Sequence, residues 1–321
     1  MTADGITAHG LTRRFGATTA LDGVDLAVPR GSVLGLLGPN GAGKTTVVRI
    51  LATLLEADAG SASVGGFDVR TQAHEVRRRI GLTGQYASVD EKLTGRENLK
   101  LIARLLDLDR RTATQRTDTL LAEFDLADAA DRPVLGYSGG MRRRLDLAAS
   151  LVGRPAFLFL DEPTTGLDPR ARLALWRLVR RLVAEGTTVL LTTQYLEEAD
   201  ALADRIVVLD RGRVIAEGTA DELKARVGAQ TLVVRAQDPA QLPELVAILE
   251  VVSGQRAETD ERRASVPAAD PALLPQVLRR LDGAGIAVDE LLLRGASLDD
   301  VFLALTGHHA ESADNDTEDA A

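Results

Sequence analysis

Short runs of apolar residues alternate with helix-like segments along the first two-thirds of the chain. Val33–Leu37 is an apolar run that ends at a glycine, and the spacing after it predicts a helix over Lys44–Leu55. Further apolar runs, each bounded by charge or glycine, occupy Phe157–Leu160, Thr187–Leu191 and Ile206–Leu209. Such runs are typical of buried parallel strands, and the helical segments between them predict crossover connections. The pattern therefore predicts an α/β fold built on a parallel sheet.

Between about residues 87 and 151 the pattern changes to leucines at helical spacing among many arginines and aspartates. This segment is predicted to be a mostly helical insert in the α/β domain. After Glu217-Gly218 and a helix near Asp221–Arg226, a second unit begins. Its apolar pattern predicts three strands, at Leu232–Val234, Ser265–Val266 and Val288–Leu293. It also predicts three helices, at Pro243–Val251, Pro271–Leu281 and Leu298–Leu305.

The last of these helices carries end signals. Ser297 and Asp300 resemble a capping box, and Gly307 is placed to end the helix. One apolar face is expected from Leu298, Val301, Phe302 and Leu305. The chain is thus predicted to contain a first domain over residues 1–227, a small α+β domain over 228–307, and a disordered acidic tail over 308–321 that is too polar to fold alone.

Composition and charge exclude several classes. The chain has no cysteine, which excludes a disulfide scaffold and a thiol nucleophile and suits a reducing compartment. Five acids of the tail account for more than half of the net charge of −9, and the remaining −4 gives no reason to expect nucleic-acid binding. No apolar run approaches the ~18 residues of a membrane span, and no secretory signal is visible. If the protein acts at a membrane, another chain is expected to supply the spans.

A glycine-rich loop follows the first predicted buried strand. It reads Gly38, Pro39, Asn40, Gly41, Ala42, Gly43, Lys44, Thr45, Thr46. Glycines let consecutive backbone N–H groups curl around a phosphate, and the helix N-terminus adds partial positive charge. Lys44 is able to reach the β- and γ-phosphates, and the Thr45 hydroxyl is able to ligate Mg²⁺. Only four of the 38 basic residues are lysines, so a lysine at this position favours phosphate binding over a plain strand–helix turn.

Two further motifs follow the loop. The run Phe157–Leu160 leads into Asp161 and Glu162. A carboxylate at the end of a buried strand is suited to hold Mg²⁺, and a second carboxylate one residue on is suited to polarise water. Between the loop and this pair, Ser138 with two glycines begins a predicted helix, which is either an ordinary cap or an anion-binding turn.

In this order the motifs resemble the ATP-binding subunits of ABC transporters, a P-loop NTPase fold with a RecA-like core and a helical subdomain, over about residues 5–225. The resemblance implies that Gly38–Thr45 is the Walker A loop and that Tyr137–Met141 is the signature motif. It also implies that Phe15 stacks on adenine, and that Gln85 contacts Mg²⁺ and the transmembrane partner.

The same resemblance assigns roles to the acidic residues. Asp161 matches the Walker B aspartate, Glu162 the catalytic glutamate and Asp168 the D-loop aspartate. ATP is then the nucleotide, and the implied Mg²⁺ contacts are Thr45, Gln85 and Asp161.

Two motifs, with three residues between them, depart from the family pattern. The signature motif begins with Tyr137 instead of leucine and ends with Met141 instead of glutamine. Gln194 occupies the switch position, where the family has a histidine that touches the γ-phosphate. Glutamine donates a hydrogen bond but carries no proton charge, so hydrolysis is expected to be slower or to depend more on Glu162.

Residues 192–200 and 297–307 resemble the daunorubicin-resistance subgroup, which energises export of antibiotics or complex lipids. The resemblance implies a head-to-tail pair of identical subunits, in which Ser138 and the Gly139 and Gly140 amides complete the γ-phosphate cage of the other copy. It further implies an integral-membrane permease of the type-2 ABC exporter class, with this chain on the cytoplasmic face of the cell membrane.

Two other functions stay open at this point. One is a soluble, non-transport ATPase of the same superfamily, such as a translation or repair factor, although these usually carry two cassettes or a long coiled coil. The other is a weakly hydrolysing regulatory ATP switch, which Met141 and Gln194 favour and the Asp161-Glu162 pair opposes.

Overall fold

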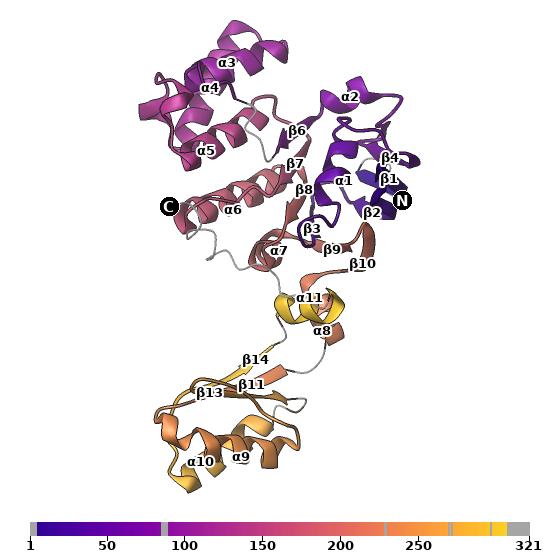
Figure 1. Cartoon of the computed structure of the whole chain (residues 1–321). Coiled ribbons are helices and arrows are strands. Elements are labelled where there is room, and N and C mark those ends of the chain that lie inside the picture. The colour runs from indigo at the N-terminus through magenta and orange to yellow at the C-terminus, as the bar shows by residue number, and fades with distance from the viewer. Residues whose placement is uncertain are drawn as a thin grey trace. The chain divides into compact units, whose positions relative to one another are not determined.

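The computed structural model describes residues 5–84, 89–227, 230–268, 270, 272–295 and 297–306. The contacts between residues divide the chain into two compact units, the first ending at Ala220 and the second beginning at Asp221. Each unit contains its own sheets and helices (Figure 1).

A six-stranded sheet forms the centre of the first unit. Its strand order is β10-β9-β3-β8-β7-β6. The bounds are β3 Val33–Leu37, β6 Ile80–Thr83, β7 Phe157–Asp161, β8 Thr188–Thr193, β9 Arg205–Asp210 and β10 Arg213–Gly218. Only β10 runs antiparallel to its neighbour, and the other five strands are parallel. The predicted parallel sheet is confirmed, because the four apolar runs form β3, β7, β8 and β9 with ends that differ by at most two residues.

The central sheet is buried on both faces, which explains why its strands are apolar throughout. All five residues of β7 are buried. Phe157 and Phe159 pack into the cluster that includes β1, β2 and α1 (Lys44–Leu51). Leu158 and Leu160 point to the opposite face and pack into the cluster of the later helices. Period-two alternation in the strand thus places successive side chains in two separate cores.

An antiparallel sheet, which the sequence pattern did not reveal, precedes and flanks the glycine-rich loop. Its order is β2-β1-β4-β5, with β1 Ile6–Phe15, β2 Thr18–Val28, β4 Ala59–Val64 and β5 Phe67–Asp68. The helix predicted to reach Leu55 is wrong at its C-terminal end, because α1 stops at Leu51 and Thr53 has a left-handed φ of 62°. A left-handed residue cannot continue a right-handed helix.

Helices cover the rest of the first unit. They are α2 Ala73–Arg77, α3 Gly95–Leu105, α4 Arg110–Glu123, α5 Gly139–Ser150, α6 Pro169–Ala184 and α7 Leu196–Leu202, with short 3₁₀ turns at Ala127–Ala129 and Val134–Gly136. Figure 1 shows α3, α4 and α5 gathered in one group. The α3 helix begins with a capping box, in which Thr94 accepts from Glu97 N and Glu97 accepts from Thr94 N.

The second unit is a small α+β domain. Its sheet has the order β12-β13-β11-β14, with β11 Gln230–Ala236, β12 Glu258–Asp260, β13 Arg263–Ala268 and β14 Val288–Arg294. Its helices are α8 Ala220–Val227, α9 Leu242–Ser253, α10 Leu273–Ala284 and α11 Leu298–Thr306, with a 3₁₀ turn at Pro239–Gln241. Leucines and valines of the sheet, α9 and α10 form its core.

The end of the chain confirms one predicted signal and corrects another. Ser297 N donates to Asp300 and Asp300 N donates to Ser297 Oγ, so the capping box is confirmed. Leu298, Val301 and Phe302 are buried, but Leu305 is 40% exposed and does not belong to the buried face. The buried face of α11 is therefore shorter than predicted, and Leu305 lies one residue before the helix ends at Thr306. Gly307 and the tail lie outside the described residues.

Candidate functional site

Three segments meet at the carboxyl edge of the central sheet. Strand β8 lies between β3 and β7, and Leu37 pairs with Thr193 while Asp161 pairs with Thr192. The glycine-rich loop, the acid pair and the end of β8 therefore follow three adjacent strands. Ligands of open α/β sheets bind at this edge, beyond the carboxyl ends of the strands.

The loop depends on glycine at two positions where any side chain would collide. A Cβ on Gly38 would lie 2.3 Å from Leu209 O. Gly43 has a φ of 108°, and its Cβ would lie 2.5 Å from Ala20 O. Strand β9 and strand β2 thus press against the loop and fix its path into α1. Pro39, Asn40, Gly41 and Ala42 form the rest of the loop, and Thr46 lies in the first turn of α1.

The Lys44 side chain makes several polar contacts at the site. Its Nζ donates to Gly38 O at 2.6 Å and to Pro39 O at 3.2 Å. The same atom lies 3.3 Å from Glu162 Oε1, and both side chains are largely buried. The structure therefore brings the loop lysine and the second acid of the pair together, although 118 positions separate them in the sequence.

Asp161 accepts two hydroxyl donors at one oxygen. Thr45 Oγ1 donates to Asp161 Oδ1 at 3.2 Å, and Thr192 Oγ1 donates to the same atom at 2.6 Å. Burial of the carboxylate is tolerable only because it is hydrogen-bonded. Thr192 was missed as a partner by the sequence reasoning; the signal was the pair of threonines that follows the apolar residues Val189–Leu191 at the end of β8.

Gln194 follows β8 at the same edge of the sheet. Its Oε1 is buried and has no hydrogen-bond partner within the described residues. An orphaned buried amide oxygen is uncommon and costs free energy. Gln194 thus brings an unsatisfied polar group close to the ends of the site strands.

The signature motif begins α5. Ser138 caps the helix by accepting from Met141 N at 3.2 Å, as predicted for a helix start. Tyr137, which replaces the usual leucine, donates its hydroxyl to Ala129 O at 2.7 Å, and burial raises the pKa of this phenol. The Met141 side chain packs against the helical core. The two signature-motif residues that depart from the family pattern, Tyr137 and Met141, therefore both contact other residues of the helical group.

A cavity of about 430 Å³ lies between the start of α5 and the acid pair. Its lining residues are Gly139, Arg142, Arg143, Asp146, Glu162, Thr165 and Gly166. Asp168 stands just beyond this lining and caps α6, accepting from Ala171 N at 2.9 Å. Gly139 of the signature motif and Glu162 thus line the same cavity.

Two predicted residues remain, Phe15 and Gln85. Phe15 ends β1, is 47% exposed, and has the Arg13 guanidinium 4.9 Å from its ring centroid. An exposed ring of this kind is able to stack on a planar base. Gln85 lies outside the described residues.

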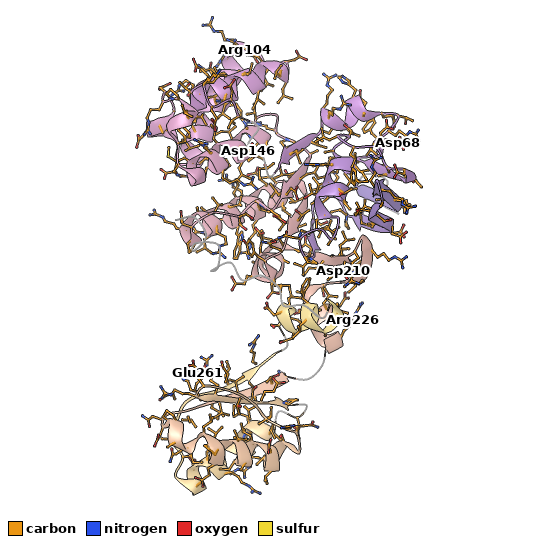
Figure 2. All side chains as sticks on the ribbon, in the orientation of Figure 1. Asp68, Arg104, Asp146, Asp210, Arg226 and Glu261 are labelled. Atoms are coloured by element: carbon orange, nitrogen blue, oxygen red, sulfur yellow. The ribbon has the colours of Figure 1, made fainter. Side chains whose placement is uncertain are left out.

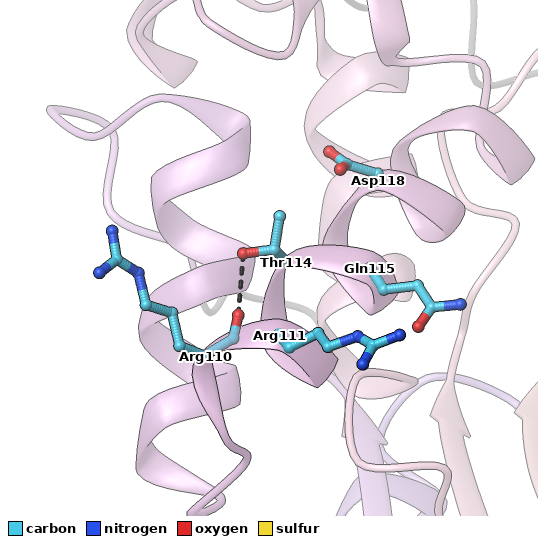
Figure 3. A pocket seen from close by; sticks show the side chains of 5 residues that line it. All are labelled: Arg110, Arg111, Thr114, Gln115 and Asp118. Carbon is cyan, nitrogen blue, oxygen red and sulfur yellow. Dashed lines mark hydrogen bonds between the residues drawn. The ribbon is translucent and has the colours of Figure 1, made fainter.

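A further hollow lies on the outer face of α4 and contains no predicted site residue. It is lined by Arg110, Arg111, Thr114, Gln115 and Asp118 (Figure 3). Thr114 Oγ1 donates back to Arg110 O within the helix. Asp118 contacts Arg96 of α3, so its charge is already compensated.

A strand–loop–helix turn whose lysine and threonine meet two carboxylates at the end of another strand of the same parallel sheet is the arrangement of a P-loop ATPase. A group of three helices, α3 to α5, precedes β7 in the chain. Among the described residues, no helix is long and apolar enough to cross a membrane.

Comparisons with known proteins agree with this class. Residues 21–165 match the ABC transporter family. Residues 218–306 match the C-terminal domain of DrrA1-3-like ATP-binding proteins. A solved ATP-binding subunit of an ABC transporter superposes with a TM-score of 0.64 at 30% identity, covering 69% of this chain and 92% of that one.

Relatives of known name cover nearly the whole chain. A daunorubicin resistance ATP-binding protein of Streptomyces coeruleorubidus is 56% identical over 96% of this chain and 97% of its own length. A doxorubicin resistance ATP-binding protein of Mycobacterium tuberculosis is 48% identical over 96% and 95%. The chain belongs to the ABC transporter ATP-binding proteins, in their daunorubicin-resistance group. It binds and hydrolyses ATP as a subunit of an ABC transporter.

Proposed function

We propose that this chain couples ATP binding and hydrolysis to the efflux of a drug or antibiotic of the daunorubicin and doxorubicin kind, or of a complex lipid. A separate permease of the type-2 ABC exporter class carries the cargo, and the chain works at the cytoplasmic face of the cell membrane. The proposal on cargo is supported by relatives named for daunorubicin resistance, doxorubicin resistance and Nod factor export. In this proposal the ATP-binding domain spans residues 1–227, the accessory domain 228–307 and the acidic tail 308–321.

One observation carries the mechanism: Lys44 Nζ lies 3.3 Å from Glu162 Oε1, at the sheet edge where Thr45 and Asp161 are also joined. In this arrangement Lys44 is positioned to leave the loop carbonyls for the phosphates of ATP. Glu162, released from that ammonium, takes the proton of the attacking water as general base. Gln194 donates a hydrogen bond to the γ-phosphate through its amide.

The residues at the edge fit a magnesium ion. Thr45 Oγ1 and Asp161 Oδ1 lie 3.2 Å apart and offer the hard oxygen atoms that Mg²⁺ prefers. Together with Gln85, these residues would hold the ion, which supplies charge neutralisation on the phosphate oxygens when it is bound.

We also propose that two copies of the chain close head to tail on two ATP molecules. Ser138 and the amides of Gly139 and Gly140 then face the nucleotide of the other copy. The cavity shared by Gly139 and Glu162 supports this arrangement, since it leaves the start of α5 open beside the acid pair. The positive end of α5 suits it to an incoming γ-phosphate.

The test is a Glu162→Gln variant of the full chain. Removal of the base should reduce steady-state ATP turnover to a few per cent of wild type or less, while ATP affinity stays equal or becomes tighter. Phosphate release measures turnover, and light scattering with ATP should show a trapped dimer. Glu185→Gln, on the exposed end of α6, is the matched control and should behave as wild type. Turnover near wild type in Glu162→Gln would remove Glu162 as the base.

Cargo is tested separately, with the permease present. Cells that express both subunits should lower intracellular anthracycline fluorescence, and Lys44→Ala should abolish the effect. ATP-dependent lipid export without anthracycline efflux would select the lipid alternative.

A further inference from the structure

One arginine of the helical group reaches across to the catalytic edge. Arg143, five residues after Ser138 on α5, has a side chain only 14% exposed. Its guanidinium donates to four backbone carbonyls on two segments. Nη1 donates to Gly84 O at 2.5 Å, Nε to Pro163 O at 3.1 Å, and Nη2 to Asp161 O at 3.1 Å and Glu162 O at 2.7 Å. The five donors of a planar guanidinium make such a multiple contact possible, and the single ammonium of lysine does not match it.

The backbone that Arg143 contacts is strained. Glu162 has a φ of 49°, a left-handed conformation that is uncommon and energetically unfavourable for a residue with a side chain. Hydrogen bonds at both sides of the residue hold it there. Glu162 N lies 3.1 Å from both Thr192 O and Thr192 Oγ1, and Glu162 O accepts from Arg143. The left-handed turn directs the Glu162 carboxylate toward Lys44.

Charge keeps the guanidinium in place. Burial lowers the pKa of Arg143, and nearby Asp146 and Asp161 act in the opposite direction. Asp146 is 1% exposed, lies 3.9 Å from Arg143 Nη1, and is labelled in Figure 2 on α5, where this helix approaches β6. Removing one partner of a buried ion pair is destabilising, because it leaves the other charge buried without compensation.

We propose that Arg143 is a positioning residue for hydrolysis: its guanidinium holds the backbone of Glu162 in the left-handed conformation, so that the carboxylate is aligned only while α5 is docked against the sheet edge. This inference rests on the proposed role of Glu162 as base. Because α5 also carries the signature motif, the contact connects the region that faces the partner's nucleotide with the base of the chain's own site.

The experiment compares Arg143→Gln and Arg143→Lys with Arg144→Gln in the full chain. Arg144 lies on the same helix and also donates to backbone carbonyls, those of Phe124 and Asp125, but within the helical group. For Arg143→Gln we expect kcat to fall at least tenfold with the ATP dissociation constant changed less than threefold. Arg143→Lys should recover part of kcat, and Arg144→Gln should stay within twofold of wild type.

A cycle with Glu162→Gln separates positioning from a general structural lesion. In the Glu162→Gln background, Arg143→Gln should lower the residual turnover no further, because the base it positions is already absent. Three outcomes would each overturn the proposal. The first is a further tenfold fall of turnover in the Glu162→Gln background, and the second is a loss of ATP affinity in Arg143→Gln that parallels the fall of kcat. The third is a kcat of Arg143→Gln within twofold of wild type. Glu162→Gln is measured before the Arg143 variants. If that variant retains turnover, Glu162 is not the base, and the proposed function is refuted separately from the role of Arg143.

Urea unfolding followed by the fluorescence of Trp176, the only tryptophan of the chain, checks that each variant is folded. If Arg143→Gln does not fold, Arg143→Lys carries the test, and a kcat and ATP affinity that fall together in that variant would refute positioning.

Discussion

Glu198 on α7 is the buried titratable group whose ionisation should be most visible in stability. The residue is fully buried, and Thr164 Oγ1 donates to its Oε2 at 3.3 Å. Burial raises the pKa of this carboxyl from 4.5 to about 7, and the polar groups of Thr193, Trp176 and Thr164 offset the rise only in part. The carboxyl is therefore protonated in the folded protein at a pH where it is ionised in the unfolded chain.

This difference fixes the sign and size of a pH effect. Since the folded state binds the proton more tightly, the contribution of Glu198 to stability is fully present below pH 4.5 and is lost as the pH rises through about 7. At about 1.4 kcal/mol per pKa unit, the whole loss is about 3 kcal/mol, and most of it falls between pH 5 and pH 8. Such a change corresponds to roughly 1 M in the urea midpoint.

The perturbation is Glu198→Gln, which keeps the shape and removes the proton equilibrium. Trp176 lies on α6 of the first unit, so its fluorescence in urea follows the unit that contains Glu198. The stability of the variant relative to wild type should rise by roughly 2 to 3 kcal/mol from pH 5 to pH 8, whatever the constant offset of the substitution. Glu197→Gln is the matched control: Glu197 is the preceding residue, its side chain is 81% exposed, and its variant should show no such trend. Parallel pH profiles for Glu198→Gln and wild type would show that Glu198 does not ionise in this range.

Two further substitutions test the phosphate site. Lys44→Ala should weaken ATP binding by about ten- to a hundredfold, because a charged hydrogen bond is worth about 1.5–3 kcal/mol. A nucleotide titration measures this loss of affinity, and Lys92→Ala, at an exposed lysine, is the control. Unchanged affinity would contradict the cage argument. Gln194→His should retain ATPase activity within a few-fold, since both side chains donate to phosphate, and complete loss of phosphate release would refute this.

The sequence predicted the parallel sheet well because its strands carry a strong local signal. Phe157–Leu160 and Ile206–Leu209 are apolar at every position, as strands buried on both faces must be. The antiparallel sheet at the start of the chain gave no such signal. Strand β1 contains His9, Gly10, Arg13 and Arg14 among its apolar positions, so alternation is irregular and bulges interrupt its register with β2.

The candidate site was predictable to the extent that it is encoded by contiguous motifs. The loop around Lys44 and the Asp161-Glu162 pair are short, local patterns, and the structure places them together. Thr192, Arg143 and Glu198 were not found, because each contributes through a partner distant in sequence. A buried arginine in an arginine-rich helix is indistinguishable by pattern from its neighbours Arg142 and Arg144. Only the contacts show which of the three faces the sheet edge.

The geometry of the acid pair explains why two adjacent carboxylates serve one loop. In an extended strand, neighbouring side chains point to opposite faces, so Asp161 and Glu162 would diverge. The left-handed φ of Glu162, the residue directly after β7, interrupts this alternation. Asp161 consequently meets Thr45 while Glu162 meets Lys44, which are consecutive residues of α1. The alignment of both acids therefore depends on a strained peptide held by β8 on one side and by α5 on the other, and movement of either element should change catalysis before it changes nucleotide binding.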